Sequence, residues 1–287
     1  MSSESRRRIS VTDFLKAKGQ RKLVMIATYD YLTAKIVDEA GVDGILIGDS
    51  VIMNLYGFPT THYATIRDIV RHTQAVANAK PRALIVADMP FMTYETSRKD
   101  ALKNATKLIR AGADAVKVEG GVEIVDKVEA LVKAGIPVMG HIGLTPQRAL
   151  RLGGYKLMGK AWENALQLIE DARALEEAGA FSIVIEFTAA EVAAEITRRV
   201  KIPTICIGSG PDCDGQIIVL HDIIGLSEIE PFFAKKYVNV RELIKKAVQE
   251  YAQEVREGRF PSEEHYKKMP KEEYEKFKTE LEKKYGK

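Results

Sequence analysis

Residues 39–50 read Glu-Ala-Gly-Val-Asp-Gly-Ile-Leu-Ile-Gly-Asp-Ser, and this stretch decides the fold. Its first Gly stands where the C-terminus of an amphipathic helix needs a left-handed residue, so a helix should end there. The apolar run that follows has no polar alternation, which is typical of a strand covered on both faces. Similar joints begin at Arg110 (Arg-Ala-Gly-Ala-Asp) and Glu177 (Glu-Ala-Gly-Ala-Phe). A helix followed by a buried strand therefore repeats along the chain.

This repetition predicts an α/β fold with a parallel sheet. Strands are expected near 23–28, 44–48, 83–88, 114–119, 136–141, 181–186, 203–207 and 216–220. Helices are expected near 31–40, 65–79, 97–111, 122–134, 162–178, 189–199 and 239–256, with a short one near 11–18 at the barrel bottom. Eight such strands favour a closed (β/α)8 TIM barrel. An open doubly wound sheet is the alternative, because the last strand follows a Gly-rich loop and not a helix.

Composition places one catalytic barrel domain at 1–261 and a charged helical extension, rich in Lys and Glu, at 262–287. The apolar fraction of 46% is ample for a core, and a net charge of +3 gives no argument for nucleic acid. No run is long and apolar enough to span a bilayer, and no secretory stretch follows the basic N-terminus. Cys206 and Cys213 do not have redox-pair or zinc spacing, so Cys206 is expected to be a buried reduced thiol. We therefore expect a cytoplasmic protein with no nucleic-acid or membrane partner.

Chemically active side chains stand at the C-terminal ends of five consecutive predicted strands. In a (β/α)8 barrel these ends converge on one mouth, where active sites are built. In chain order the side chains are Asp49 with Ser50, Asp88, Lys117 with Glu119, His141, and Glu186.

So many carboxylates cannot sit together ionised without a counter-charge, which Lys117, His141 or a bound metal could supply. Oxygen ligands without thiolates suit a hard divalent ion, Mg²⁺ before Ca²⁺ or Zn²⁺. Such an ion would polarise a substrate carbonyl and stabilise an enolate. Glu186 is the candidate general base, because it comes from a later strand.

Each of these residues also has a purely structural interpretation. An acid after a strand is often only the N-cap of the next helix, and His141 alone could be a hydrogen-bonded core histidine. Lys117 could form an ion pair at the barrel rim. The density of acids at one end of the barrel favours a site.

Two Gly-rich segments imitate nucleotide-binding motifs. Residues 154–160 fit the start of a P-loop, but Ala161 stands where the motif needs a hydroxyl. Residues 208–215 lack the dinucleotide fingerprint, so a mobile active-site loop is the preferred interpretation.

At these positions the chain resembles the ketopantoate hydroxymethyltransferase family, from about Arg8 to His265. The segments that carry the resemblance are Ala27-Thr-Tyr-Asp-Tyr, Gly48-Asp-Ser, Val86-Ala-Asp-Met-Pro-Phe-Met, Ala115-Val-Lys-Val-Glu-Gly-Gly, Pro137-Val-Met-Gly-His-Ile-Gly-Leu-Thr-Pro-Gln, Leu152-Gly-Gly-Tyr-Lys, Gly210-Pro-Asp-Cys-Asp-Gly-Gln, Leu220-His-Asp and Phe260-Pro-Ser-Glu-Glu-His.

The resemblance implies a barrel that transfers a hydroxymethyl group from 5,10-methylenetetrahydrofolate to 3-methyl-2-oxobutanoate, with Mg²⁺, in pantothenate synthesis. It also implies a homo-oligomer, commonly a decamer. By position it implies that Asp49 and Asp88 are metal ligands in contact with the substrate and that Glu119 is the third acid of the metal site. Ser50 and Lys117 would contact the 2-oxo acid, His141 would line its pocket, and Glu186 would accept the proton.

The chain departs from the family pattern in three loops. It has Val51-Ile-Met where Leu-Gly-Met is usual, Thr61-His-Tyr-Ala-Thr where Leu-Pro-Val-Thr is usual, and Gly208-Ser-Gly where Gly-Ala-Gly is common. These changes leave the acids intact but bear on the one-carbon donor, so a related pterin carrier of the tetrahydromethanopterin type is the alternative.

Two other functions are alternatives. The first is a related carbon–carbon lyase or phosphomutase barrel. A lyase of the isocitrate type is disfavoured, because the chain has no Lys-Lys-Cys-Gly-His loop. A non-catalytic barrel that binds a metal and a 2-oxo acid would not need Glu186 as a base.

Overall fold

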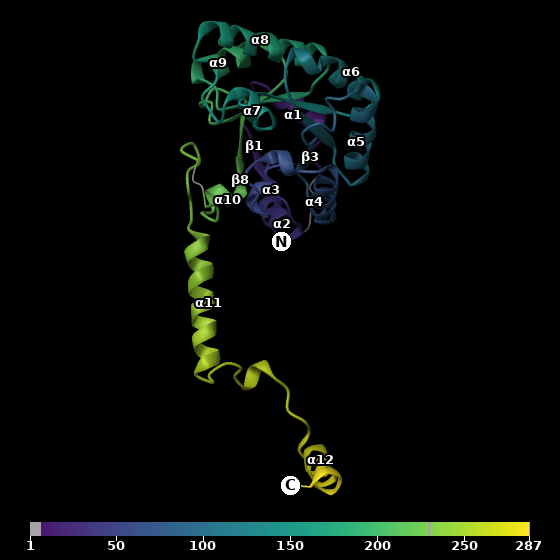
Figure 1. The fold of residues 1–287 in the computed structure, drawn as a ribbon, viewed down its shortest axis with the longest axis vertical. Coiled ribbons are helices and arrows are strands. Elements are labelled where there is room, and N and C mark those ends of the chain that lie inside the picture. The colour runs from purple at the N-terminus through teal and green to yellow at the C-terminus, as the bar shows by residue number, and fades with distance from the viewer. Residues whose placement is uncertain (1–6, 229–230, 287) are drawn as a thin grey trace. The chain divides into compact units, whose positions relative to one another are not determined.

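Eight parallel strands close into a barrel in the computed structural model, which describes residues 7–228 and 231–286 (Figure 1). Each strand pairs with its neighbours in the chain, and the last pairs in parallel with the first. The expected (β/α)8 barrel is therefore confirmed, and the open sheet is excluded. The strands are β1 (Leu23–Ala27), β2 (Gly44–Ile47), β3 (Leu84–Asp88), β4 (Ala115–Glu119), β5 (Val138–Gly143), β6 (Ser182–Glu186), β7 (Thr204–Ile207) and β8 (Gly215–Val219).

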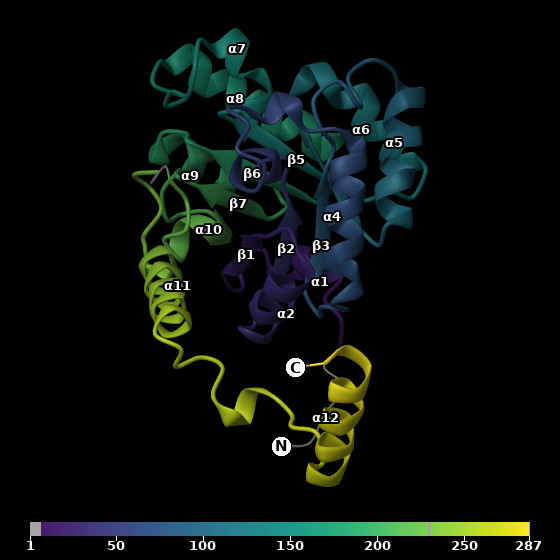
Figure 2. The ribbon, with the colours of Figure 1, turned by 60° about the horizontal axis from the view of Figure 1, so that its bottom comes forward.

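Helices surround this barrel, and Figure 2 shows α4, α5 and α6 beside the strands. The α-helices of the barrel unit are α1 (Val11–Ala17), α2 (Tyr31–Glu39), α3 (Val51–Asn54), α4 (Ile66–Asn78), α5 (Arg98–Arg110), α6 (Val125–Lys133), α7 (Ala149–Leu152), α8 (Trp162–Glu177), α9 (Ala190–Arg199) and α10 (Leu220–Ile223). Short 3₁₀ turns are η1 (Thr61–Tyr63), η2 (Val122–Ile124) and η3 (Pro146–Arg148).

Local sequence sets where these helices begin and end. Thr65 caps α4 in a reciprocal box with Asp68, which satisfies backbone donors of the first turn. Gly112 follows α5 at φ +109°, and a Cβ there would lie 2.4 Å from Ala77 Cβ. Only glycine fits that joint, so the predicted helix-to-strand turn forms there.

The core has two layers, one inside the barrel and one between the strands and the helices. Phe14 of α1 is fully buried in the inner layer, where its ring lies 6.0 Å from that of Phe181. Met25 and Leu84 pack in the same layer. The short N-terminal helix thus contributes to the interior of the barrel, as expected for a plug.

The crossover from β7 to β8 has no helix and returns through residues 208–214. Cys206 and Cys213 are joined in a disulfide in this structure, so the expectation of a free buried thiol is wrong. The tight return brings their Cα atoms to 5.8 Å, within the range that a disulfide spans. Spacing along the sequence does not reveal such a return.

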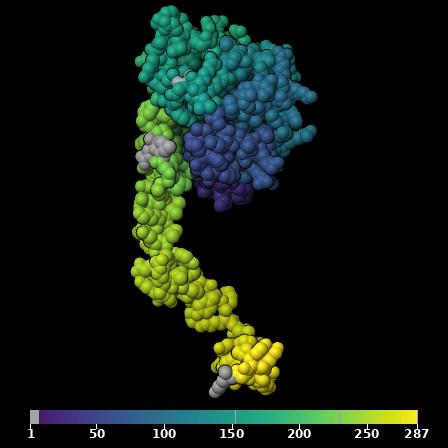
Figure 3. Space-filling view, viewed as in Figure 1, coloured from purple at the N-terminus to yellow at the C-terminus, as the bar shows by residue number. Residues whose placement is uncertain are grey.

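The chain divides into two compact units, Met1–Val238 and Asn239–Lys287. The second unit contains α11 (Val240–Arg256), η4 (Glu263–His265) and α12 (Lys271–Tyr285), none with a buried residue. Side chains of α11 and α12 lie at the surface in Figure 3. The helix expected at 239–256 forms, but it belongs to the second unit, so the unit boundary precedes the one expected after 261. In the described ranges, none of the helices has the length and apolar character needed to cross a membrane.

Candidate active site

The predicted residues meet at the carboxyl ends of the strands. The strand register places Asp88 beside Lys117 and Glu119 beside His141. Glu186 ends β6 next to Gly143 of β5. Asp49, Asp88, Lys117, Glu119 and His141 are all at most 4% exposed. The five strand ends therefore converge, as the sequence indicated.

Lys117 is the central cation of this cluster. Its Nζ lies 3.0 Å from Asp88 Oδ1, 3.1 Å from His141 Nδ1 and 3.8 Å from Glu119 Oε1. Burial alone would lower the pKa of Lys117, but the charges of Asp88, Glu119 and Asp49 outweigh burial and raise it. Lys117 is thus held as an ammonium ion among the acids.

His141 bridges two acids. Its Nδ1 lies 3.2 Å from Glu119 Oε1, and its Nε2 lies 3.1 Å from Glu186 Oε2 without hydrogen-bond alignment. Burial and Lys117 lower the pKa of His141, but Glu119 and Glu186 raise it to about 9 overall. The His141 ring therefore lies between the carboxyl groups of Glu119 and Glu186.

Asp49 and Asp88 are two neighbouring carboxyl groups of the site. The Asp49 backbone N–H donates to Asp88 Oδ2 at 3.0 Å. Burial raises the pKa of Asp49 well above its usual value, and the charges of Asp88 and Glu119 raise it further. Burial also raises the pKa of Asp88, against the charge of Lys117.

The donor set fits Mg²⁺. Among the described residues, the ion pairs of the four acids are to Lys117 and His141, so a divalent cation could balance the remaining negative charge. No group of three or more His, Cys, Asp and Glu side chains within 7–228 and 231–286 is arranged to hold a metal. Mg²⁺ commonly takes only one or two protein carboxylates and leaves its other positions to water and substrate, so Asp49 and Asp88 suffice.

Ser50 lies at the edge of this cluster, just before α3. Its Oγ is 2.8 Å from the hydroxyl of Tyr29, which also accepts from Asn54 Nδ2 at 3.0 Å. Tyr29 is fully buried, and burial raises the pKa of its phenol. The Ser50 hydroxyl is therefore held by a neutral phenol.

Sequence reasoning missed several polar residues that support the site. The Tyr94 hydroxyl donates to the Glu119 carbonyl at 2.8 Å and accepts from the Glu119 N–H at 2.9 Å. The Gln147 amide donates to Asp49 Oδ2 at 2.8 Å. Gln147 ends the segment 137–147, which carries part of the family resemblance. A buried amide has no charge pattern in the sequence that would mark it as functional.

The two lookalike motifs do not form nucleotide sites. In the first, Met158 pairs with Thr188 instead of opening a helix. Tyr155 of the same loop has a pKa raised to about 12 by burial and by the charges of Glu186, Asp49 and Glu119. The second motif is the β7–β8 crossover.

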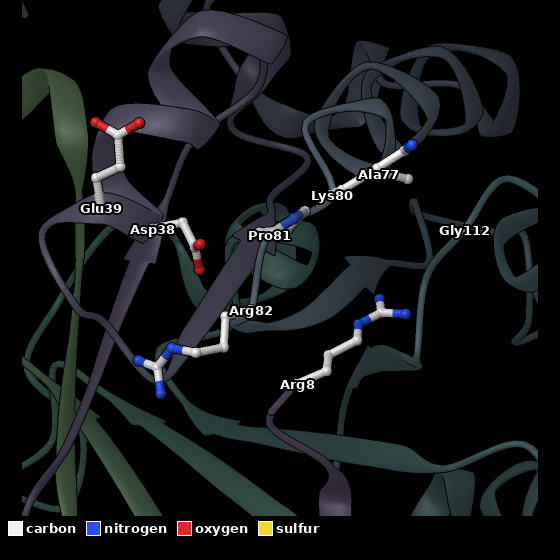
Figure 4. A pocket seen from close by; sticks show the side chains of 8 residues that line it. All are labelled: Arg8, Asp38, Glu39, Ala77, Lys80, Pro81, Arg82 and Gly112. Carbon is white, nitrogen blue, oxygen red and sulfur yellow. The ribbon is translucent and has the colours of Figure 1, made fainter. Parts of the chain in front are cut away.

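A cavity of about 660 Å³ lies elsewhere (Figure 4). Its lining residues are Arg8, Asp38, Glu39, Ala77, Lys80, Pro81, Arg82 and Gly112. Arg82 precedes β3 and Gly112 precedes β4, so this cavity is at the amino ends of the strands, away from the acids.

Comparison with known proteins supports the family resemblance. The family model described as ketopantoate hydroxymethyltransferase matches residues 8–263. A 3-methyl-2-oxobutanoate hydroxymethyltransferase of Pyrobaculum calidifontis is 62% identical over 262 residues, covering 91% of this chain and 99% of that protein. One from Hyperthermus butylicus is 59% identical over 272 residues, covering 94% of both chains.

Solved structures share the fold at low identity. A phosphonopyruvate hydrolase superposes with a TM-score of 0.61 at 16% identity, covering 97% of this chain and 100% of its own. A 2,3-dimethylmalate lyase of the PEP mutase/isocitrate lyase superfamily gives a TM-score of 0.56 at 17% identity, covering 95% and 98%. At this identity the likeness concerns the fold alone.

Proposed function

The chain belongs to the ketopantoate hydroxymethyltransferase family, and from this premise we propose that it converts 3-methyl-2-oxobutanoate to 2-dehydropantoate for pantothenate and coenzyme A biosynthesis. The one-carbon donor in this proposal is 5,10-methylenetetrahydrofolate or a related pterin carrier. The observation that carries it is the convergence of Asp49, Asp88, Lys117, His141 and Glu186 at one barrel mouth. A keto acid bound there would meet cationic, acidic and basic groups together.

Two carboxylates at this mouth are proposed to hold the metal. When bound by Asp49 and Asp88, Mg²⁺ would polarise the keto group and stabilise the substrate's enolate. Glu119 is proposed as the third acid of the metal site; its Oε2 accepts from Gln147 N–H at 3.0 Å, and its Oε1 lies 3.2 Å from His141 Nδ1. Its proposed place is beside the ion, where its Oε1 also lies 3.8 Å from Lys117 Nζ.

Glu186 is proposed to remove the C3 proton. Its carboxylate is the most accessible of the four acids, with 17% of the side chain exposed, so a substrate can reach it. The C–H electron pair then delocalises onto the keto oxygen, and C3 attacks the one-carbon unit of the carrier. Both C–N bonds that join this carbon to the carrier break: one is replaced by the new C–C bond and the other by a C–O bond to a water oxygen. One carrier nitrogen takes up the proton that Glu186 removed and the other takes up a proton of the water, which gives the hydroxymethyl product and the tetrahydro form of the carrier.

Lys117 and Ser50 are proposed to orient the 2-oxo acid. The raised pKa of Lys117 keeps its ammonium ion available to an anionic carboxylate. The Ser50 hydroxyl is fixed by Tyr29 and can donate to a substrate oxygen. A homo-oligomer, commonly a decamer in the resembled family, and a cytoplasmic location stay predictions.

The test is product formation from 3-methyl-2-oxobutanoate with each carrier in turn. Mg²⁺-dependent appearance of 2-dehydropantoate with a tetrahydrofolate or a tetrahydromethanopterin carrier is the expected result, and chelation of the metal should stop it. Failure with both carriers, combined with carbon–carbon cleavage of a 2-oxo acid product, would instead favour a lyase.

A further inference from the structure

Gln147 lies at the centre of the acid cluster without having a charge itself. It belongs to η3, after β5, and is only 2% exposed. Both its backbone and its side chain contact acids that come from other strands. A buried amide that joins two acids must be placed there by the fold with its donors and acceptors satisfied.

The orientation of this amide is fixed by its partners. Nε2 donates to Asp49 Oδ2 at 2.8 Å and to the Met89 carbonyl at 3.0 Å, which uses both of its hydrogens. Oε1 lies 3.2 Å from the hydroxyl of Tyr94. A flipped amide would put its oxygen against a carboxylate and a carbonyl, so the opposite assignment is excluded.

The Gln147 backbone is held as firmly as its side chain. Its N–H donates to Glu119 Oε2 at 3.0 Å. Its carbonyl accepts from His62 Nε2 at 2.9 Å, and since a carbonyl can only accept, the His62 ring carries its proton on Nε2. The backbone N–H, the backbone carbonyl, Nε2 and Oε1 of Gln147 therefore each have a partner before any ligand binds.

We propose that Gln147 is a positioning residue that holds Asp49 Oδ2 and Glu119 Oε2, so that Asp49 presents its other oxygen, Oδ1, to the metal. No hydrogen bond to Asp49 Oδ1 forms among the residues that the structure describes. This inference rests on the proposed function in one respect, namely that Asp49 binds a divalent ion.

An uncharged donor suits this position better than a cation would. An amide satisfies one oxygen of Asp49 and leaves the negative charge of the carboxylate available to the metal. A Lys or Arg at position 147 would neutralise that charge and compete with the ion.

Replacing Gln147 by Met tests the role, because Met has nearly the same shape and no donor. The metal-free protein is titrated with Mn²⁺, without substrate or carrier, and free Mn²⁺ is followed by electron paramagnetic resonance. Gln147→Met should raise the Kd by about 10–100-fold, as expected when a partner of a metal-binding carboxylate is lost. The metal concentration for half-maximal activity should rise in parallel, while kcat at saturating metal recovers most of its value.

Gln167→Met is the matched control. Gln167 also donates its amide to a carboxylate, Asp171 Oδ1 at 3.2 Å, but on the exposed face of α8. Its Kd for Mn²⁺ should equal that of the unaltered protein. Gln147→Asn, whose amide is one methylene too short to reach Asp49, is the second variant and should weaken Mn²⁺ binding like Met, which covers the case that Gln147→Met fails to fold.

Two results would overturn the inference, and they differ in meaning. A folded Gln147→Met or Gln147→Asn protein that binds Mn²⁺ as tightly as the unaltered protein removes the role from Gln147 and leaves the proposed function standing. An unaltered protein that binds no Mn²⁺ at all removes both this inference and the metal from the proposed function.

Discussion

Several carboxyl groups of the site lie close together, so their negative charges repel one another when they are ionised. Asp49 is the extreme case, since burial and two neighbouring acids make its ionisation costly in the metal-free protein. In the unfolded chain the same carboxyl ionises near its usual value of 3.8. The folded protein therefore loses stability as the pH rises above about 4, until the pH passes the raised folded-state pKa of Asp49. The ionised form of Asp49, which the proposed metal site needs, therefore lowers the free energy of unfolding of the metal-free protein.

Replacing Asp49 by Asn should consequently stabilise the metal-free protein. The gain in free energy of unfolding should be absent near pH 4 and grow toward pH 8, because Asn has no charge to bury. Guanidinium unfolding in the presence of a chelator, at pH 5 and pH 8, measures it. Added Mg²⁺ should stabilise the unaltered protein and have little effect on Asp49→Asn. A gain of equal size at both pH values would contradict the account, and the exposed Asp212→Asn serves as control.

Glu186 gives a prediction about chemistry rather than stability. Glu186→Gln keeps the shape but removes the base, so exchange of the C3 proton of 3-methyl-2-oxobutanoate in deuterated water should slow by at least about 100-fold. Substrate binding, measured by calorimetry, should change little. Glu191→Gln, on the exposed face of α9, should exchange at the normal rate. Exchange that is unchanged in Glu186→Gln would assign the base to another residue.

The charged members of the site were predictable because each lies at or just beyond the C-terminal part of a buried strand, and parallel strands bring these ends to one edge. Gln147 and Tyr94 were not predictable as supports. Gln147 comes from the short turn η3 and Tyr94 from the loop between β3 and α5, and each contacts an acid that is distant in the sequence. Their contacts depend on how loops fold over the barrel mouth, which periodicity does not encode.

At the scale of elements, the crossover from β7 to β8 has no helix that packs it against the barrel, so side-chain hydrogen bonds must hold it in place. Asp214 provides these bonds: its Oδ2 accepts from Lys18 Nζ at 2.8 Å and from Thr204 N–H at 2.9 Å. Its Oδ1 accepts from Gly19 N–H at 3.2 Å. One nearly buried carboxylate thus joins the end of α1 to the starts of β7 and β8.

Replacing Asp214 by Ala should cost about 3 kcal/mol of unfolding free energy, because it leaves buried donors and a half-buried ammonium without their acceptor. Asp214→Asn should cost less, as its remaining oxygen still accepts. Asp212→Ala, on the exposed part of the same crossover, should stay within about 0.5 kcal/mol of the unaltered protein. Urea unfolding compares the three, and equal losses for Asp212→Ala and Asp214→Ala would show that the crossover is not fastened at this residue.

Long periodic elements were predicted well, and short or closely packed ones were not. The eight strands and the long barrel helices have apolar patterns that span several turns or a whole strand. The four-residue helices α3, α7 and α10 are too short to show a period. The Cys206–Cys213 bond was predicted wrongly because it depends on the path of a loop.

At the scale of the whole molecule, every buried core residue within 7–228 and 231–286 precedes Asn239. The described residues of the second unit, 239–286, include none, although α11 contains apolar side chains at helical spacing. Those that are exposed are Leu243, Ile244, Val248, Tyr251 and Val255. The sequence indicated this helix but not its unit, because an amphipathic pattern predicts an apolar face without saying what covers it.

We expect a second copy of the chain to bury the apolar stripe of α11, in keeping with the predicted homo-oligomer. An exposed stripe of this kind costs about 25 cal/mol for each Å² left in water, which association relieves. Val248→Glu places a charge in the stripe and should lower the molar mass measured by light scattering at micromolar concentration. Gln249→Glu adds the same charge on the polar side of the helix and should leave the mass unchanged. If both variants keep the mass of the unaltered protein, subunits associate through another surface, and if the unaltered protein has the mass of one chain, the prediction of an oligomer fails.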